Sequence, residues 1–147
     1  MLYRVRTGIL AFRVFAREAA RERGEGVQST HAEERPERYI GCCGAYCRTC
    51  RAFADVTCRG CKLGYESGAR ALESAKCAMK RCCLGRGHET CADCPEATQC
   101  PVLQGFFGKN GYKYRKYRES TEFIRAHGYD AFVARASGWK GACGPLG

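Results

Sequence analysis

A chain of 147 residues is long enough for one compact domain and too short for two of ordinary size. Its thirteen cysteines and formal net charge of +10 set it apart from an average globular protein. The apolar start is interrupted by arginines, no segment has the length of a membrane-spanning helix, and the cysteine count is odd. We therefore expect a cytoplasmic protein whose reduced thiols bind metal, rather than a secreted domain held by disulfides.

Residues 1–38 contain no cysteine and look unlike the rest of the chain. Apolar residues from Leu2 to Ala19 recur at helical spacing with arginines between them, and a polar, glycine-containing stretch follows. We interpret this part as an N-terminal extension, flexible or helical, or as a chain start assigned too early. The alternative is an arginine-rich amphipathic helix on a membrane surface or a partner.

Residues 39–104 form the cysteine-rich module, which we expect to bind metal. One helix is predicted within it, over residues 67–83, because Leu72, Ala75 and Met79 follow a helical period. Glycines shortly after residue 83 would end this helix.

The first cysteine cluster contains two pairs, Cys47/Cys50 and Cys58/Cys61. Two residues between the cysteines of a pair let both sulfurs reach one ion, and two such turns supply a tetrahedral set. Gly60 would relieve crowding where backbone amides face the sulfurs. The spacing therefore predicts one complete four-thiolate site.

The second cluster is less regular. Cys91 and Cys94 form a pair, and Cys100 is a natural third ligand. The fourth ligand is Cys82 or Cys77, which lie five residues apart and would not align on an ideal helix.

About two zinc ions are expected, with an iron–sulfur cluster as the alternative. Cys43 precedes the first pair with a spacing that also suits iron–sulfur ligation. Cys42, Cys83 and Cys143 are expected to be small buried groups or unused thiols. The predicted metal ligands are Cys43, Cys47, Cys50, Cys58, Cys61, Cys77, Cys82, Cys91, Cys94 and Cys100.

The module resembles the cysteine-rich family catalogued as domain of unknown function 3795. The likeness covers about residues 39–104, and a weaker likeness extends into the tail. It rests on the Cys43-Gly44-Ala45-Tyr46-Cys47-Arg48-Thr49-Cys50 and Cys58-Arg59-Gly60-Cys61 runs, on the step from Cys77 to Cys82, and on Cys91-Ala92-Asp93-Cys94 with Cys100. The family's closing Pro-Cys is inverted here to Cys100-Pro101. The resemblance implies a small zinc-binding module and no assigned activity.

Residues 105–147 are expected to form a basic helical tail packed on the module, since they carry eight basic and three acidic side chains. Asn110 is expected to cap a helix that ends at Gly128, and Asp130 to cap a shorter one. Trp139 would then pack back onto the module.

Within the tail, residues 109–118 interleave basic and aromatic side chains. Such a segment could contact RNA, because lysine and arginine neutralise phosphates and tyrosine stacks on unpaired bases. The interpretation we favour is an amphipathic helix with inward-facing tyrosines and solvated charges.

The fold class expected from these features is a small α+β or mainly α, loop-rich, metal-stabilised domain with zinc-knuckle-like turns. Saturated four-cysteine sites leave no open coordination position, which argues against metal catalysis. The sequence thus predicts a structural-zinc binding protein of unassigned role that contacts an unknown protein or a nucleic acid. An iron–sulfur or thiol redox protein is the alternative, and a metallo-enzyme using His88, Glu89 or Asp93 ranks third.

Overall fold

The computed structural model describes residues 35–147. All but the last four residues of the predicted extension, with its helical and membrane-surface alternatives, therefore lie outside the described residues. The described part consists of helices and loops without a β-sheet, apart from one isolated bridge between Ile40 and Tyr46. The mainly α class is confirmed for this part of the chain, and the α+β alternative is wrong for it. None of the helices between residues 35 and 147 is long and apolar enough to cross a membrane.

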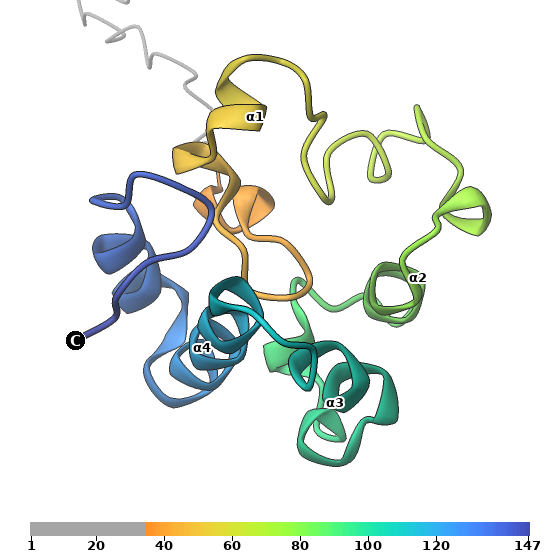
Figure 1. Cartoon of the computed structure of the whole chain (residues 1–147). Coiled ribbons are helices and arrows are strands. Elements are labelled where there is room, and N and C mark those ends of the chain that lie inside the picture. The colour runs from red at the N-terminus through yellow and green to blue at the C-terminus, as the bar shows by residue number, and fades with distance from the viewer. Residues whose placement is uncertain (1–34) are drawn as a thin grey trace, which may run out of the picture. The chain divides into compact units, whose positions relative to one another are not determined.

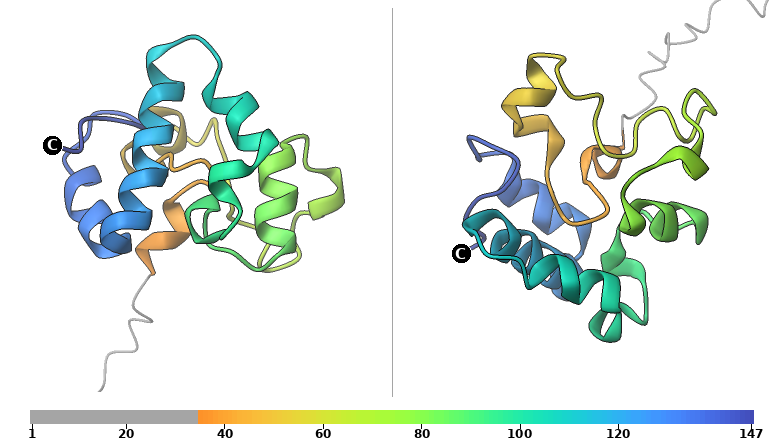
Figure 2. Two further views of the ribbon diagram at one scale, coloured as in Figure 1. Left: turned by 90° about the horizontal axis from the view of Figure 1, so that it is seen from below. Right: turned by 45° about the vertical axis from the view of Figure 1, so that its right-hand side comes forward.

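Helix α3 lies between α2 and α4, and the turns that link α1 to α2 arch away from α3 and α4 (Figures 1 and 2). Short 3₁₀ turns interrupt the loops and carry several of the cysteines. The α-helices of the described residues are α1 (Arg51–Ala54), α2 (Ala78–Gly85), α3 (Pro101–Phe107) and α4 (Tyr112–Ala136). The 3₁₀ turns there are Pro36–Tyr39, Cys47–Thr49, Leu72–Ser74, Cys91–Asp93 and Ala97–Gln99.

The helix predicted over residues 67–83 is wrong in its first half. Only a 3₁₀ turn, Leu72–Ser74, precedes α2. The guanidinium of Arg70 donates to the carbonyls of Gly60 and Leu63, both at 3.1 Å, and the Arg70 amide donates to the carbonyl of Gly64 at 2.8 Å. These bonds close the segment into a loop. Its apolar residues therefore recur at helical spacing although the backbone there is not an α-helix.

Helix α4 follows the prediction closely. Gly128 has φ 81° and ψ 176°, which interrupts the helix where the sequence places its end. A second helical stretch continues to Ala136, also as predicted. The predicted cap at Asn110 is wrong, because the helix begins after Gly111 and no side chain caps it. Helix α3 was not predicted, although Pro101 at its start is a common first helical residue.

A core of apolar side chains joins α4 to the cysteine-rich module, and none of its buried members is a cysteine. Its centre is Phe132, which is fully buried and packs edge-on against Tyr46 at 6.2 Å and Trp139 at 5.5 Å between ring centroids. The indole Nε1–H of Trp139 donates to the carbonyl of Pro145 at 2.9 Å. Trp139 therefore packs back onto the module as predicted. The buried members of this apolar core are Ile40, Tyr46, Ala92, Ile124, Phe132, Ala136 and Trp139.

Gly44 brings the first cysteine turn against α4. Its φ of +86° lies in the left-handed region, and a Cβ there would lie 2.8 Å from Cβ of Ser120 and 3.1 Å from the carbonyl oxygen of Tyr117. The hydroxyl of Thr121 also donates to the carbonyl of Cys43 at 3.3 Å. The glycine thus allows the turn between Cys43 and Cys47 to touch the helix backbone.

We predict that Gly44→Ala destabilises the protein more than Gly68→Ala. Gly68 also has a positive φ, +72°, but a Cβ there would meet nothing within 4 Å. Both variants carry the backbone strain, and only Gly44→Ala adds the clash with α4, so we expect a further loss on the order of 1–3 kcal/mol. Thermal or urea unfolding of the two variants measures the difference. Equal losses would show that the close approach to α4 is unimportant.

Candidate metal centre

A second core of the described residues is built largely from cysteine, and we call it the cysteine core. Its buried members are Cys42, Met79, Cys83, Cys91, Ala97 and Leu103. Five more cysteines pack against it while partly buried: Cys43, Cys61, Cys77, Cys94 and Cys100. All thirteen cysteines of the chain are free thiols. The largest concentration of potential metal ligands therefore lies inside the fold and not on its surface.

Four thiols in and beside this core lie next to one another in a row, Cys61–Cys42–Cys83–Cys91. The backbone reinforces the row, since the amide of Cys91 donates to the carbonyl of Cys42 at 3.0 Å. The thiol of Cys83 also lies 3.4 Å from the carbonyl oxygen of His88. We call these four cysteines the thiol row. It joins the first cysteine cluster to the second.

Ionisation within the row starts at Cys42. Hydrogen bonds from the thiols of Cys61 and Cys83, helped by the cations of Lys62 and Lys80 and opposed by burial, lower the pKa of Cys42 to about 4. The pKa of Cys61 and that of Cys83 are raised, first because each thiol is hydrogen-bonded to Cys42 and then by burial and neighbouring thiolates. The pKa of Cys91 is also lowered, first by its hydrogen bond with Cys83, so the row favours the thiolate form at both Cys42 and Cys91.

A buried lysine lies next to the row. Only 1% of Lys62 is exposed, and its ammonium donates to the carbonyl of Glu89 at 2.9 Å and to its carboxylate at 2.8 Å. Arg35 donates to the same carboxylate at 2.6 Å. Two cations thus meet one carboxylate, which leaves positive charge beside Cys42.

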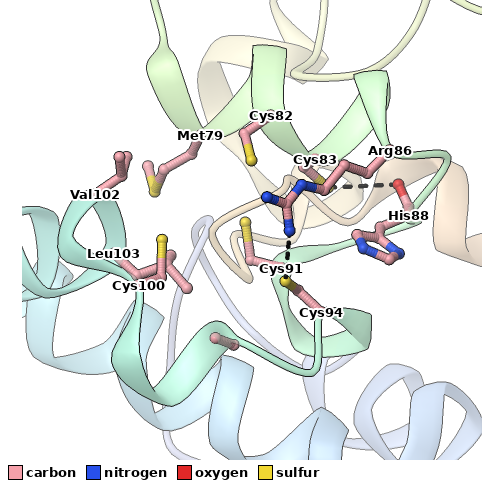
Figure 3. Close-up of a pocket in the computed structure, with 11 residues that line it drawn as sticks. Met79, Cys82, Cys83, Arg86, His88, Cys91, Cys94, Cys100, Val102 and Leu103 are labelled. Atoms are coloured by element: carbon pink, nitrogen blue, oxygen red, sulfur yellow. Dashed lines mark hydrogen bonds between the residues drawn. The ribbon is translucent and has the colours of Figure 1, made fainter.

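A pocket of the cysteine core gathers most of the second predicted ligand set. It is partly open to solvent, and the sulfurs of Cys82, Cys91 and Cys100 face the same space (Figure 3). Cys94 lies at its edge, where the Arg86 guanidinium approaches the sulfur to 3.8 Å.

The first predicted ligand set is distributed differently. Cys47 lies within electrostatic reach of Cys50 and Cys58, and burial raises the pKa of Cys47. The backbone amide of Cys61 faces the Cys47 sulfur, as Gly60 led us to expect, but the Cys61 thiol is hydrogen-bonded to Cys42.

The remaining cysteines flank these groups. Burial, with a smaller contribution from nearby Cys42 and Cys77, raises the pKa of Cys43 to about 12. Cys143 lies within electrostatic reach of Cys50, and burial raises its pKa as well. The segment before Cys143 is held against the first cluster because the Thr49 hydroxyl donates to the carbonyl of Gly141 at 2.8 Å.

Between residues 35 and 147, no group of three or more histidine, cysteine, aspartate or glutamate side chains stands where it could hold a metal ion. The donors themselves fit a thiophilic ion, because the pocket is lined by thiols. Their spacing does not make a finished coordination shell. A bound ion would have to draw the sulfurs together.

Sequence reasoning set aside Cys42 and Cys83, the two central thiols of the row, and did not single out Lys62. Each of these cysteines belongs to a vicinal pair, Cys42-Cys43 or Cys82-Cys83. The pairs were the available signal, because the second cysteine of each pair offers a thiol beyond the predicted ligand set. Nothing in the sequence indicates that Lys62 is buried.

The basic and aromatic segment agrees with the interpretation we favoured. Phe106 of α3 packs against Tyr114 at 5.1 Å and stacks on Tyr117 at 6.1 Å between ring centroids. Lys116 pairs with Glu119. Tyr112 remains 56% exposed.

No family model matches this chain, and no curated protein and no solved structure matches it either. The resemblance to domain of unknown function 3795, which rests on the cysteine pattern, therefore remains a prediction.

A polar network ties the Cys91 turn to α4. The phenol of Tyr129 donates to Oδ2 of Asp93 at 2.7 Å and lies 3.0 Å from the hydroxyl of Thr90. Asp93 also accepts from the Thr90 amide, and the Thr90 hydroxyl accepts from the amide of Ala92, which forms a capping box around the turn. The orientation of Cys91 and Cys94 depends on this network.

We predict that Tyr129→Phe lowers the free energy of unfolding by about 1–2 kcal/mol, because Asp93 loses a hydrogen bond to its carboxylate. Tyr112→Phe is the matched control, since Tyr112 is exposed, and it should leave stability unchanged. Urea unfolding followed by Trp139 fluorescence compares them. Equal stability of the two variants would contradict an anchoring role for the network.

Proposed function

We propose that this chain is a structural metal-binding protein that holds zinc, about two ions, through cysteine thiolates. The observation that carries the proposal is the pocket in which Cys82, Cys91, Cys94 and Cys100 line one space. These four cysteines are one of the two ligand combinations predicted for the second cluster. Zinc is the ion that thiolate sets of this kind most commonly bind in a reducing compartment.

The chemistry of the pocket favours a structural role over catalysis. Beside the thiols the pocket is lined by Arg86, which contacts Cys94 and Glu96, and by the imidazole of His88. Four thiolates would complete the coordination of zinc and leave no position for a substrate. We therefore propose no enzymatic activity. Bound zinc would supply cross-links between α2, the Cys91 turn and the start of α3.

An iron–sulfur cluster would use the same thiolates, and thiol redox chemistry would use the same thiols, so these alternatives belong to the same test. We expect about two zinc ions per chain and no visible absorption band after purification without oxygen. Elemental analysis with an absorption spectrum measures both. Iron with sulfide and a brown colour would replace zinc by a cluster and turn the role toward electron transfer. Protein that holds neither metal would refute the proposal.

A pair of variants separates loss of ligands from damage to the pocket. Cys94→Ser with Cys100→Ser removes two thiolates, and we expect about one fewer zinc ion per chain. Met79→Leu changes a buried residue of the same pocket without removing a thiolate, and such a volume-conserving change costs less than about 1.5 kcal/mol. Its zinc content should equal that of the unaltered chain. An unchanged zinc content in the cysteine variant would place the metal elsewhere.

The partner we propose is a protein or a single-stranded RNA, and α4 offers the surface for RNA. The exposed ring of Tyr112 lies 5.8 Å from the guanidinium of Arg115 and 5.7 Å from the ammonium of Lys116. An aromatic ring flanked by cations suits stacking on a base with phosphates alongside.

RNA binding has a direct test. We predict that replacing Lys113, Arg115 and Lys116 by alanine weakens binding of single-stranded RNA and reduces its salt dependence. The control replaces three other exposed basic residues, Lys76, Arg81 and Arg135, and should have a smaller effect. Fluorescence anisotropy at two salt concentrations measures both. No binding at low salt would rule out RNA and leave a protein partner.

We propose the cytoplasm as the compartment, because thiols remain reduced there. We also propose, from the same cysteine motifs, that the chain is related to domain of unknown function 3795. It adds no activity.

A further inference from the structure

The thiol row is the feature that neither the predicted ligand sets nor the pocket explains. Cys42 and Cys83 are 1% and 2% exposed and stand at its centre, between Cys61 and Cys91. A cysteine whose only role is to fill space needs no thiol neighbours. Here every member of the row touches another member. The row therefore needs an account of its own.

We propose that Cys42, Cys61, Cys83 and Cys91 form a second thiolate site for a thiophilic divalent ion, which takes one sulfur from each of four segments. This inference rests on the proposed function, because it assumes that the chain binds such ions. It changes the predicted ligand set in two ways. Cys42 and Cys83 become metal ligands, and Cys61 binds an ion other than the one predicted for Cys47, Cys50 and Cys58.

The spacing within the row suits an ion. Zinc–sulfur bonds of about 2.3 Å in a tetrahedron place neighbouring sulfurs roughly 3.8 Å apart. The neighbouring thiols of the row are packed together in the cysteine core, as sulfurs on one ion must be. The row differs from a tetrahedron because it is extended, and no three of its members converge in the described structure. Cys61 and Cys91, at its ends, would turn toward Cys42 and Cys83 when an ion replaces the thiol protons.

The charge around the row also suits an ion held by thiolates. Four thiolates on a divalent ion carry two negative charges in excess, which is costly in a buried place without a cation. Lys62 is buried beside Cys42, and together with Arg35 it provides one positive charge more than Glu89 neutralises.

Cys91 belongs both to the row and to the lining of the pocket. Two ions, one in the row and one in the pocket, would therefore share its sulfur. The predicted pair of independent zinc sites becomes one two-metal thiolate cluster that links both cysteine motifs.

The test uses the full chain loaded with an NMR-active cadmium isotope in place of zinc. Correlation of cadmium with the β-protons of its ligand cysteines identifies those ligands directly in the unaltered protein. We expect one cadmium signal to correlate with Cys42 and Cys83, and Cys91 to correlate with two cadmium signals. Correlations from other cysteines without any from Cys42 and Cys83 would overturn the row site while the proposed metal binding stands. Absence of bound cadmium and zinc altogether would overturn the proposed function as well.

A variant pair gives an independent readout. Cys42→Ala with Cys83→Ala should lower the metal content by about one ion per chain, while Cys143→Ala, outside the cysteine core, should leave it unchanged. Near-ultraviolet circular dichroism of Trp139 shows whether the apolar core of each variant is folded. A folded double variant with full metal content would refute the row site.

Discussion

A protonated thiol packs as a small apolar group, whereas a thiolate in the same place is a buried anion that needs a cation beside it. The cysteine core is built on this double nature. As thiols, Cys42, Cys83 and Cys91 fill space next to Met79 and Leu103. As thiolates they would need the positive charge of Lys62 or of a bound ion. The arrangement of α2, the Cys91 turn and the start of α3 follows from bringing these side chains to one place.

The apolar core holds the same turns from the other side. Tyr46 lies between two cysteines of the first cluster, and Ala92 lies between the paired cysteines of the second. Both are buried against α4, so alternate residues of one turn serve two different cores. Gly44 and the network around Tyr129 complete this attachment. The two cysteine turns are therefore not independent of the rest of the fold, since a long helix fixes both of them.

Short-range signals in the sequence correctly predicted the parts of the structure that depend on neighbouring residues. The interruption at Gly128 and the return of Trp139 were predictable because a glycine stop and an apolar period are short-range features. The loop that replaces the first half of the predicted helix was not, since it depends on Arg70 reaching the carbonyls of Gly60 and Leu63. The pairing of thiols was the least predictable part. Spacing shows which cysteines share a turn, but only the fold shows that the Cys61 side chain lies against Cys42.

The division into two cores has a consequence for the life of the protein in a cell. Because alternate residues of one turn serve both cores, opening of the cysteine core would also loosen the apolar core around Phe132. The loop after α1 already extends into solvent, where Val56 is 82% exposed with φ 57°. Exposed loop tips of this kind are preferred sites of proteolytic cleavage. If the thiols hold metal, degradation would begin in this loop when the metal is scarce, and the abundance of the protein would follow the metal supply.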